Sequence, residues 1–377
     1  MTRPLFAIPP PTQMGGGLAG ASIPPVPLSN AERAATIDVF ERLVFGRVPN
    51  AARHPALRFE EISPDTPAMG DAAIRRQVRV RYGGPGGEGH FDVLAFIPAS
   101  ATQGAPVPAT LFLNNRDPAE TADPDRVRRS PFWDAERIVA RGFAAVTFHL
   151  GSVVPDNADG FDGHLQSLFL APGETKALDA WGTIAAWAWC GSRAMDWIET
   201  EPRIDARRVM VAGHSRGGKT ALWCAANDTR FAMAVSNCSG CVGAKLNRAW
   251  LPRAEDIAAI TKTFPHWFCE NFSQFAGRDR ELPFDQHQLL ALIAPRRLYV
   301  SSATLDAWAG QPGEFLSLLL ASEAWRAGGR AALPPDTPFP PPDTPVFGDG
   351  VAYHIRSGIH TIESSDWDHW LDMFVSN

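Results

Sequence analysis

The sequence contains no run that approaches the roughly 20 apolar residues of a membrane-spanning helix, and its first residues lack the apolar centre of a signal peptide. As written, we expect a soluble, cytoplasmic chain. An excess of positive charge is also missing, because 35 Lys and Arg stand against 41 Asp and Glu and the two signs are interspersed. This balance argues against nucleic acid or a membrane as a partner and favours a small molecule. We also expect a monomer.

Cysteine is scarce, and the odd number of five at irregular spacings argues against a disulfide framework. Cys238 and Cys241 have C-x-x-C spacing, but no second Cys or His pair accompanies them. Buried thiols are therefore favoured over a zinc or redox site, and a local disulfide stays open. Internal repeats and interdomain linkers are missing too. We predict a Pro/Gly-rich extension over residues 1–28 and one catalytic domain over 29–377.

The pattern of apolar residues predicts an α/β fold. Two alternating segments, 74–82 and 90–97, predict an antiparallel hairpin, and the short apolar runs that follow alternate with helical stretches. This predicts a mainly parallel sheet with helices on both faces. The expected strands are Ala109–Leu113, Phe143–His149, Val209–Ala212, Met233–Ser236, Leu298–Ser302 and Val351–Arg356. One helix is expected after an N-cap at Asn30. Three further helices are expected at Phe132–Ala140, about Asp179–Thr200, and Asp366–Val375. The Pro-rich segment Leu333–Pro345 is expected to be a surface loop.

The run from Val209 to Trp223 combines a strand, the turn Gly-His-Ser-Arg-Gly and a helix. This is the G-x-S-x-G pattern in its required context, and it predicts Ser215 as a nucleophile. Gly213 and Gly217 leave room for the sharp turn that exposes the hydroxyl. The first N–H groups of the helix and its dipole favour an oxyanion above Ser215. A structural turn without chemistry is the alternative.

The chain order Ser, acid, His places both partners of Ser215 downstream. His360 lies on the loop after the last strand and is the predicted general base, whereas His354 and His369 are expected to be packing or surface residues. Asp306, which follows the penultimate strand, is the predicted acid. Glu314 is an alternative acid, but we prefer an ordinary helix-start role for it.

Six segments carry further information: Gly213–Lys219, Ser239–Ala244, Phe264–Phe268, Leu282–His287, Asp306–Ala309 and Tyr353–His360. Together they resemble the glucuronoyl esterases of carbohydrate esterase family 15, especially the bacterial members, which are usually secreted or periplasmic. The resemblance implies an α/β-hydrolase fold and no metal or other cofactor. It also implies a serine esterase for esters of (4-O-methyl-)glucuronic acid, such as lignin-carbohydrate esters on glucuronoxylan.

The same resemblance implies roles for four further residues. Arg216 would stabilise the oxyanion through its backbone N–H and its guanidinium, and Lys219 would hydrogen-bond sugar hydroxyls. Glu255 matches a glutamate that contacts the sugar, and Trp308 matches a tryptophan that lines the uronate site. Without such a site, Arg216 and Lys219 would be ordinary solvated helix residues.

This sequence departs from the family pattern at two places. Some members carry a glutamate acid where this chain has Cys238, so the role falls to Asp306, and Gly310-Gln311 replaces Asp-Pro. A metal cluster of Asp366, Asp368 and His369 is disfavoured because the spacing is poor. Two other functions stay open: another enzyme on the same fold, such as an acetyl esterase or an aminopeptidase, and a catalytically silent binding module.

Overall fold

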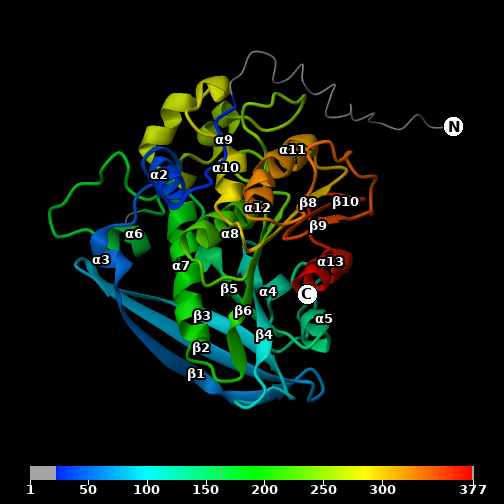
Figure 1. The fold of residues 1–377 in the computed structure, drawn as a ribbon. Helices are drawn as coiled ribbons and strands as arrows, with labels where there is room; N and C mark the ends of the chain where they lie inside the picture. Colours follow the sequence, from blue (N-terminus) through cyan, green and yellow to red (C-terminus); the bar gives the residue numbers. More distant parts are fainter. Residues whose placement is uncertain (1–22, 162, 376–377) are drawn as a thin grey trace.

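The computed structural model describes residues 23–161 and 163–375, so most of the predicted extension lies outside it. Ten strands form one sheet in the order β1-β2-β3-β5-β4-β6-β7-β8-β10-β9 (Figure 1). The six strands from β5 to β10 in that order run parallel, and antiparallel strands flank them at both edges. The strands are β1 Ala56–Ala68, β2 Ala73–Gly84, β3 Gly87–Pro98, β4 Val107–Asn114, β5 Ala144–His149, β6 Ile204–His214, β7 Met233–Asn237, β8 Arg297–Ala303, β9 Val346–Gly348 and β10 Val351–Arg356.

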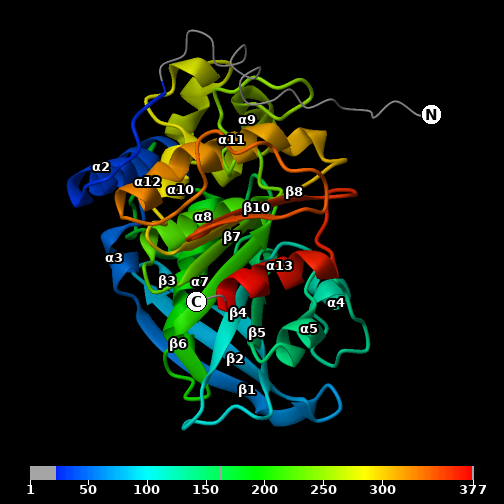
Figure 2. The same cartoon turned by 45° about the vertical axis from the view of Figure 1, so that its right-hand side comes forward.

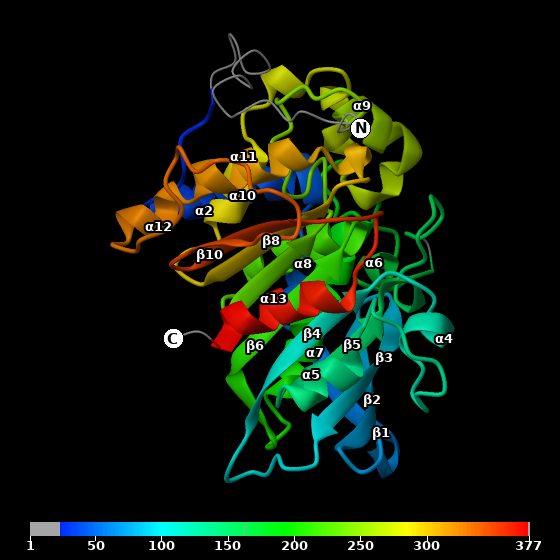
Figure 3. The ribbon, with the colours of Figure 1, turned by 90° about the vertical axis from the view of Figure 1, so that its right-hand side faces the viewer.

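Helices cover both faces of this sheet (Figures 2 and 3). The pair α7 (Thr183–Ile198) and α8 (Arg216–Asn227) packs on one face, and α5 (Ala135–Ala140) and α13 (Ser364–Val375) pack on the other. The remaining helices are α2 Asn30–Phe40, η1 Glu41–Phe45, α3 Asn50–Arg53, α4 Pro118–Thr121, η2 Leu150–Ser152, α6 Leu165–Leu168, α9 Ile257–Thr263, η3 Pro265–Trp267, η4 Glu270–Phe275, η5 Asp279–Glu281, α10 Gln286–Ala291, η6 Ala307–Ala309, α11 Gln311–Ala321 and α12 Glu323–Ala327. Among the described helices, none combines the length and apolar character needed to cross a membrane.

Successive residues of β6 alternate between the two faces, as the twofold period of a strand requires. Val209 and Val211 pack into the larger core beneath α7 and α8, whereas Met210 and Ala212 pack into the smaller core beneath α5 and α13. Burial on both faces explains why this strand is a continuous apolar run. The central strand that carries the serine turn is therefore rigidly held.

Most of the predicted elements are confirmed, with three differences. The N-cap of α2 is Ser29 and not Asn30, because the Ser29 hydroxyl accepts from the Glu32 N–H while the Glu32 carboxylate accepts from the Ser29 N–H, which makes a capping box. Helix α5 begins only at Ala135, after its cap Asp134. The prediction also missed both edge strands, β1 and β9, because neither has a buried residue or a clear alternation of apolar positions.

The sheet topology brings the candidate catalytic residues to one edge. The carboxyl ends of neighbouring parallel strands meet there, which is where open α/β sheets bind ligands. Ser215 directly follows β6, Cys238 follows β7, Asp306 follows β8, and His360 lies on the loop after β10. Residues far apart in the sequence are thus placed side by side by strand order.

Candidate active site

The Ser215 backbone has φ 56° and ψ −122°, a conformation that residues with a side chain rarely adopt. A Cβ at position 213 would lie 2.1 Å from the Gly217 carbonyl oxygen, and a Cβ at position 217 would lie 2.8 Å from the Leu113 carbonyl oxygen. The Ser215 N–H donates to the Asn237 carbonyl at 2.8 Å. The strained turn is therefore possible because Gly213 and Gly217, two residues to either side of Ser215, carry no side chain, and because β7 holds the Ser215 backbone.

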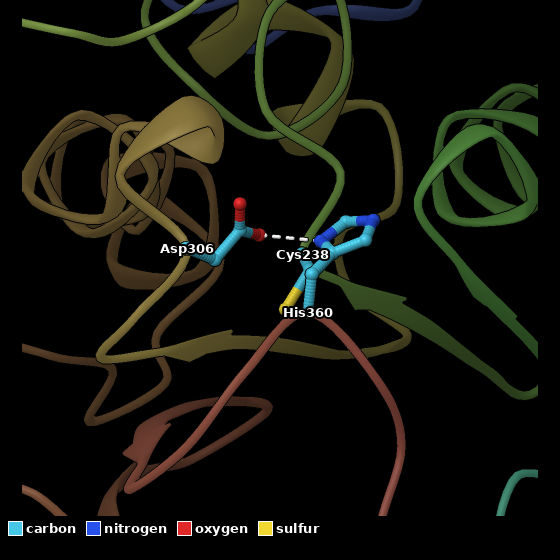
Figure 4. A group of neighbouring side chains, drawn as sticks. All are labelled: Cys238, Asp306 and His360. Carbon is cyan, nitrogen blue, oxygen red and sulfur yellow. Dashed lines mark hydrogen bonds and ion pairs between the residues drawn. The ribbon is translucent and has the colours of Figure 1, made fainter.

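His360 and Asp306 form a direct hydrogen bond of 2.6 Å between Nδ1 and Oδ2 (Figure 4). Asp306 is only 5% exposed and also caps η6 by accepting from the Ala309 N–H at 3.3 Å. Because a carboxylate only accepts, the proton lies on Nδ1 of His360 and the lone pair on Nε2. The His360 ring packs against His214, the neighbour of Ser215, with ring centroids 4.3 Å apart. The imidazole thus lies beside the serine turn.

The alternative acid, Glu314, lies in the first turn of α11 but points elsewhere. Its carboxylate accepts from the Ser302 hydroxyl at 2.5 Å and from the Gly240 N–H at 2.9 Å. The side chain is completely buried, and burial raises the pKa of Glu314 to about 7. The expectation of an ordinary helix-start charge is therefore wrong, because Glu314 is a buried support for the turn at Ser239 and Gly240.

Arg356, at the end of β10, holds the loop that carries His360. Its guanidinium donates to the carbonyls of Ser357 at 2.8 Å, and of Ile359 and Thr361 at 2.9 Å each. Its Nε also donates to buried Asp366 at 3.0 Å. One side chain therefore fixes the backbone on both sides of His360.

The other C-terminal polar residues have partners of their own. Asp366 accepts from His354 Nε2 at 2.7 Å, and Asp368 pairs with Arg137 at 2.8 Å. The His369 ring lies 4.9 Å from that of His354. Asp366 and Asp368 therefore have separate partners, His354 and Arg137.

Arg216, the first residue of α8, carries its charge beside Ser215. Its guanidinium pairs with Asp156 and lies 5.3 Å from the ring centroid of Trp267. Burial, and then Arg116, lowers the pKa of Arg216. Asp156 also accepts from His266 at 2.9 Å and from the Trp267 indole at 2.6 Å. Sequence reasoning missed Asp156 because its loop carries no periodic pattern.

Lys219 lies one helical turn after Ser215 and is almost completely buried. Its ammonium donates to the Ser239 carbonyl and lies 3.7 Å from the Glu255 carboxylate. Burial raises the pKa of Glu255, and Lys219 is the main group that opposes this rise. Lys219 is thus no ordinary solvated helix residue. Next to this pair, Trp308 is 52% exposed, and its carbonyl accepts from the Glu255 N–H at 2.8 Å.

His214 and Asn237 form a second layer beneath the site that the sequence did not single out. His214 Nδ1 lies 2.6 Å from the Asn237 Oδ1, and the Asn237 amide donates to the Ser301 hydroxyl at 2.8 Å. Burial, and then His360, lowers the pKa of His214 well below its usual range. A neutral His214 can therefore support the His360 ring without adding a competing charge.

All five cysteines are buried free thiols, as favoured.

A family model described as glucuronyl esterase, fungi, matches residues 132–329. Carbohydrate esterase MZ0003, from an unknown prokaryotic organism, is 34% identical over 396 residues, which cover 98% of this chain and 89% of that relative. The chain belongs to the glucuronoyl esterase family. Membership makes the protein a carboxylic ester hydrolase, which confirms the resemblance seen in the six segments.

Solved structures place this family member in the α/β-hydrolase fold, as predicted. A glucuronoyl esterase from Solibacter usitatus is 33% identical, with a TM-score of 0.82 over 94% of this chain and 98% of that one. The 4-O-methyl-glucuronoyl methylesterase of Podospora anserina is 29% identical over 234 residues, 60% of this chain. The match spans 48% of that fungal relative, about half of its length.

Proposed function

We propose that residues 29–377 act as one catalytic unit that hydrolyses esters of (4-O-methyl-)glucuronic acid through an acyl-enzyme on Ser215. His360 Nε2 accepts the hydroxyl proton as Ser215 Oγ attacks the ester carbonyl, and Asp306 stabilises the imidazolium that forms. His360 then protonates the departing alcohol. A water molecule, activated by the same nitrogen, releases the acid and restores the serine.

Arg216 stabilises the negative charge of both tetrahedral intermediates. Its backbone N–H belongs to the free first turn of α8, and its guanidinium is held beside the nucleophile by Asp156. The Arg216 side chain is 31% exposed, so its guanidinium remains accessible to a substrate oxygen. A cation in a partly buried site stabilises developing charge more strongly than it would in water.

The arrangement of Lys219, Glu255 and Trp308 is the observation that favours a sugar acid over a simple ester. The buried ammonium and carboxylate offer a donor and an acceptor for sugar hydroxyls, and the exposed indole offers an apolar face for the ring. An acetyl ester would use none of these groups. We therefore assign the acyl side of the ester to a glucuronate unit, free or on an oligosaccharide.

The direct test compares benzyl glucuronate with an aryl acetate on the same enzyme. We expect a clearly higher kcat/KM for the uronate ester, and similar values for the two substrates would instead support a general esterase. Labelling of Ser215 by a fluorophosphonate separates both cases from a silent binding module, which would not react.

Variants then test the sugar contacts. Lys219→Ala should lower kcat/KM on the glucuronate ester by about 1–3 kcal/mol in transition-state terms, and the acetate should barely change. Because this change leaves Glu255 buried without its partner, the exposed Trp308→Ala serves as a matched variant with less risk to the fold. Circular dichroism on both proteins checks the fold. A parallel loss on both substrates would mean that these residues support the serine turn and not the sugar.

A further inference from the structure

Cys238 occupies an unusual position at the end of β7. Its backbone has φ 49°, and its N–H donates to the Ser301 carbonyl at 2.7 Å. The backbone thus holds the side chain on the acid side of the site, next to the Asp306–His360 pair (Figure 4). The sulfur, a carboxylate oxygen of Asp306 and a ring nitrogen of His360 all lie within 4.8 Å of one another.

We propose that Cys238, Asp306 and His360 form a binding site for a thiophilic divalent cation such as Zn²⁺, and that occupation of this site switches the esterase off. The inference rests on the proposed roles of Asp306 and His360. Sulfur, imidazole nitrogen and carboxylate oxygen are the ligands that zinc prefers, and three protein ligands leave a fourth position for water. Within residues 23–161 and 163–375, this is the one group of three such side chains close enough to share an ion.

The geometry needs only a modest adjustment. With Zn–N near 2.0 Å and Zn–S near 2.3 Å, ligand atoms of a tetrahedral site lie about 3.4–3.6 Å apart. The 2.6 Å contact between His360 Nδ1 and Asp306 Oδ2 must therefore open by about 0.8 Å, while the sulfur approaches. Cys238 and Asp306 are buried, but the His360 side chain is 39% exposed, so the ion enters from the His360 side.

Binding of the ion would inhibit the enzyme through the tautomer of His360. In the free enzyme Nδ1 carries the proton and Nε2 the lone pair. An ion can bind Nδ1 only after the ring proton has shifted from Nδ1 to Nε2, which frees the lone pair of Nδ1 for the metal. The protonated Nε2 can then no longer accept the Ser215 proton. The Cys238 thiol loses its proton to solvent as the metal–sulfur bond forms, so one proton is released for each ion bound. No oxidant or reductant is required, and a chelator reverses the reaction.

The experiment titrates the full chain with Zn²⁺ alone and with Co²⁺ alone. Zn²⁺ should inhibit both aryl acetate hydrolysis and fluorophosphonate labelling of Ser215, and EDTA should restore both. Co²⁺ should bind one ion per chain and produce a sulfur-to-cobalt charge-transfer band in the near ultraviolet. That band needs neither activity nor a uronate ester, so it reports on the site even if the proposed substrate is wrong.

Cys238→Ala is the test variant, and Cys241→Ala is its control because Cys241 is also a buried free thiol. Relative to the activity of each variant without metal, Cys238→Ala should raise the half-inhibiting Zn²⁺ concentration at least about tenfold and abolish the cobalt band. Cys241→Ala should match the wild type in both readouts. Equal Zn²⁺ sensitivity of Cys238→Ala and wild type, or a cobalt band that survives in it, would overturn the proposal. Cys238→Ser, judged by the same readouts, replaces the alanine variant if that variant does not fold.

Discussion

Glu314→Gln should make the free energy of unfolding less sensitive to rising pH. In the folded state burial raises the pKa of Glu314 from 4.5 to about 7, so the folded protein holds a proton that the unfolded chain releases. The free energy of unfolding must then fall as pH rises through this window and level off above the folded-state pKa. A tenfold change in proton affinity is worth about 1.4 kcal/mol, so the full penalty is about 3 kcal/mol.

Gln keeps the shape of Glu314 and carries no charge. Its amide oxygen can accept from the Gly240 N–H, while its NH₂ group faces Ser302. Urea unfolding at about pH 5 and about pH 8 gives the measurement. Between about pH 5 and about pH 8, the free energy of unfolding of the wild type should fall by about 2–3 kcal/mol more than that of the variant.

Glu88→Gln, at an exposed position, is the control for this experiment. Its free energy of unfolding should change with pH as that of the wild type does. The comparison with the wild type also cancels the effects of the other buried carboxyls, such as Glu255. If the curves of Glu314→Gln and the wild type are parallel, then Glu314 is not held protonated by burial, and our account of its environment is refuted.

The catalytic residues support three further predictions. Ser215→Ala and His360→Ala should each leave less than about a thousandth of the ester hydrolysis rate, whereas His369→Ala should be milder; an indispensable His369 with a dispensable His360 would contradict the assignment. Asp306→Asn should lower kcat by up to about 10⁴-fold, and far more than Glu314→Gln, because the amide cannot hold the required imidazole tautomer; small, equal losses would point to another acid. Arg356→Lys keeps a positive charge beside Asp366 but cannot hold three carbonyls, so kcat should fall about ten- to a hundredfold with KM little changed and the pH profile altered; a wild-type kcat would show that His360 needs no such support.

The sequence was sufficient to predict the elements and residues that follow local rules. The serine turn needs glycine on both sides, and the strands are short apolar runs, so both were visible in the pattern. The hydrogen bond between His360 and Asp306 matches the pairing expected from chain order. In contrast, Asp156 lies on an irregular loop, and its contact with Arg216 is created only by the folded chain. The burial of Glu314 was equally hidden, because a carboxylate in a first helical turn normally faces solvent.

The short helix η6 connects Asp306 and Trp308 within one turn of backbone. Asp306 caps it from the proton-transfer side, and Trp308 leaves it two residues later toward the exposed side of the site. A displacement of the η6 backbone would therefore move the indole and the carboxylate together, so a substrate that shifts this turn would change turnover as well as affinity. A substitution at position 308 that leaves this backbone in place would change the indole face alone. Lys219 lies on the separate helix α8, so its backbone is not part of this turn.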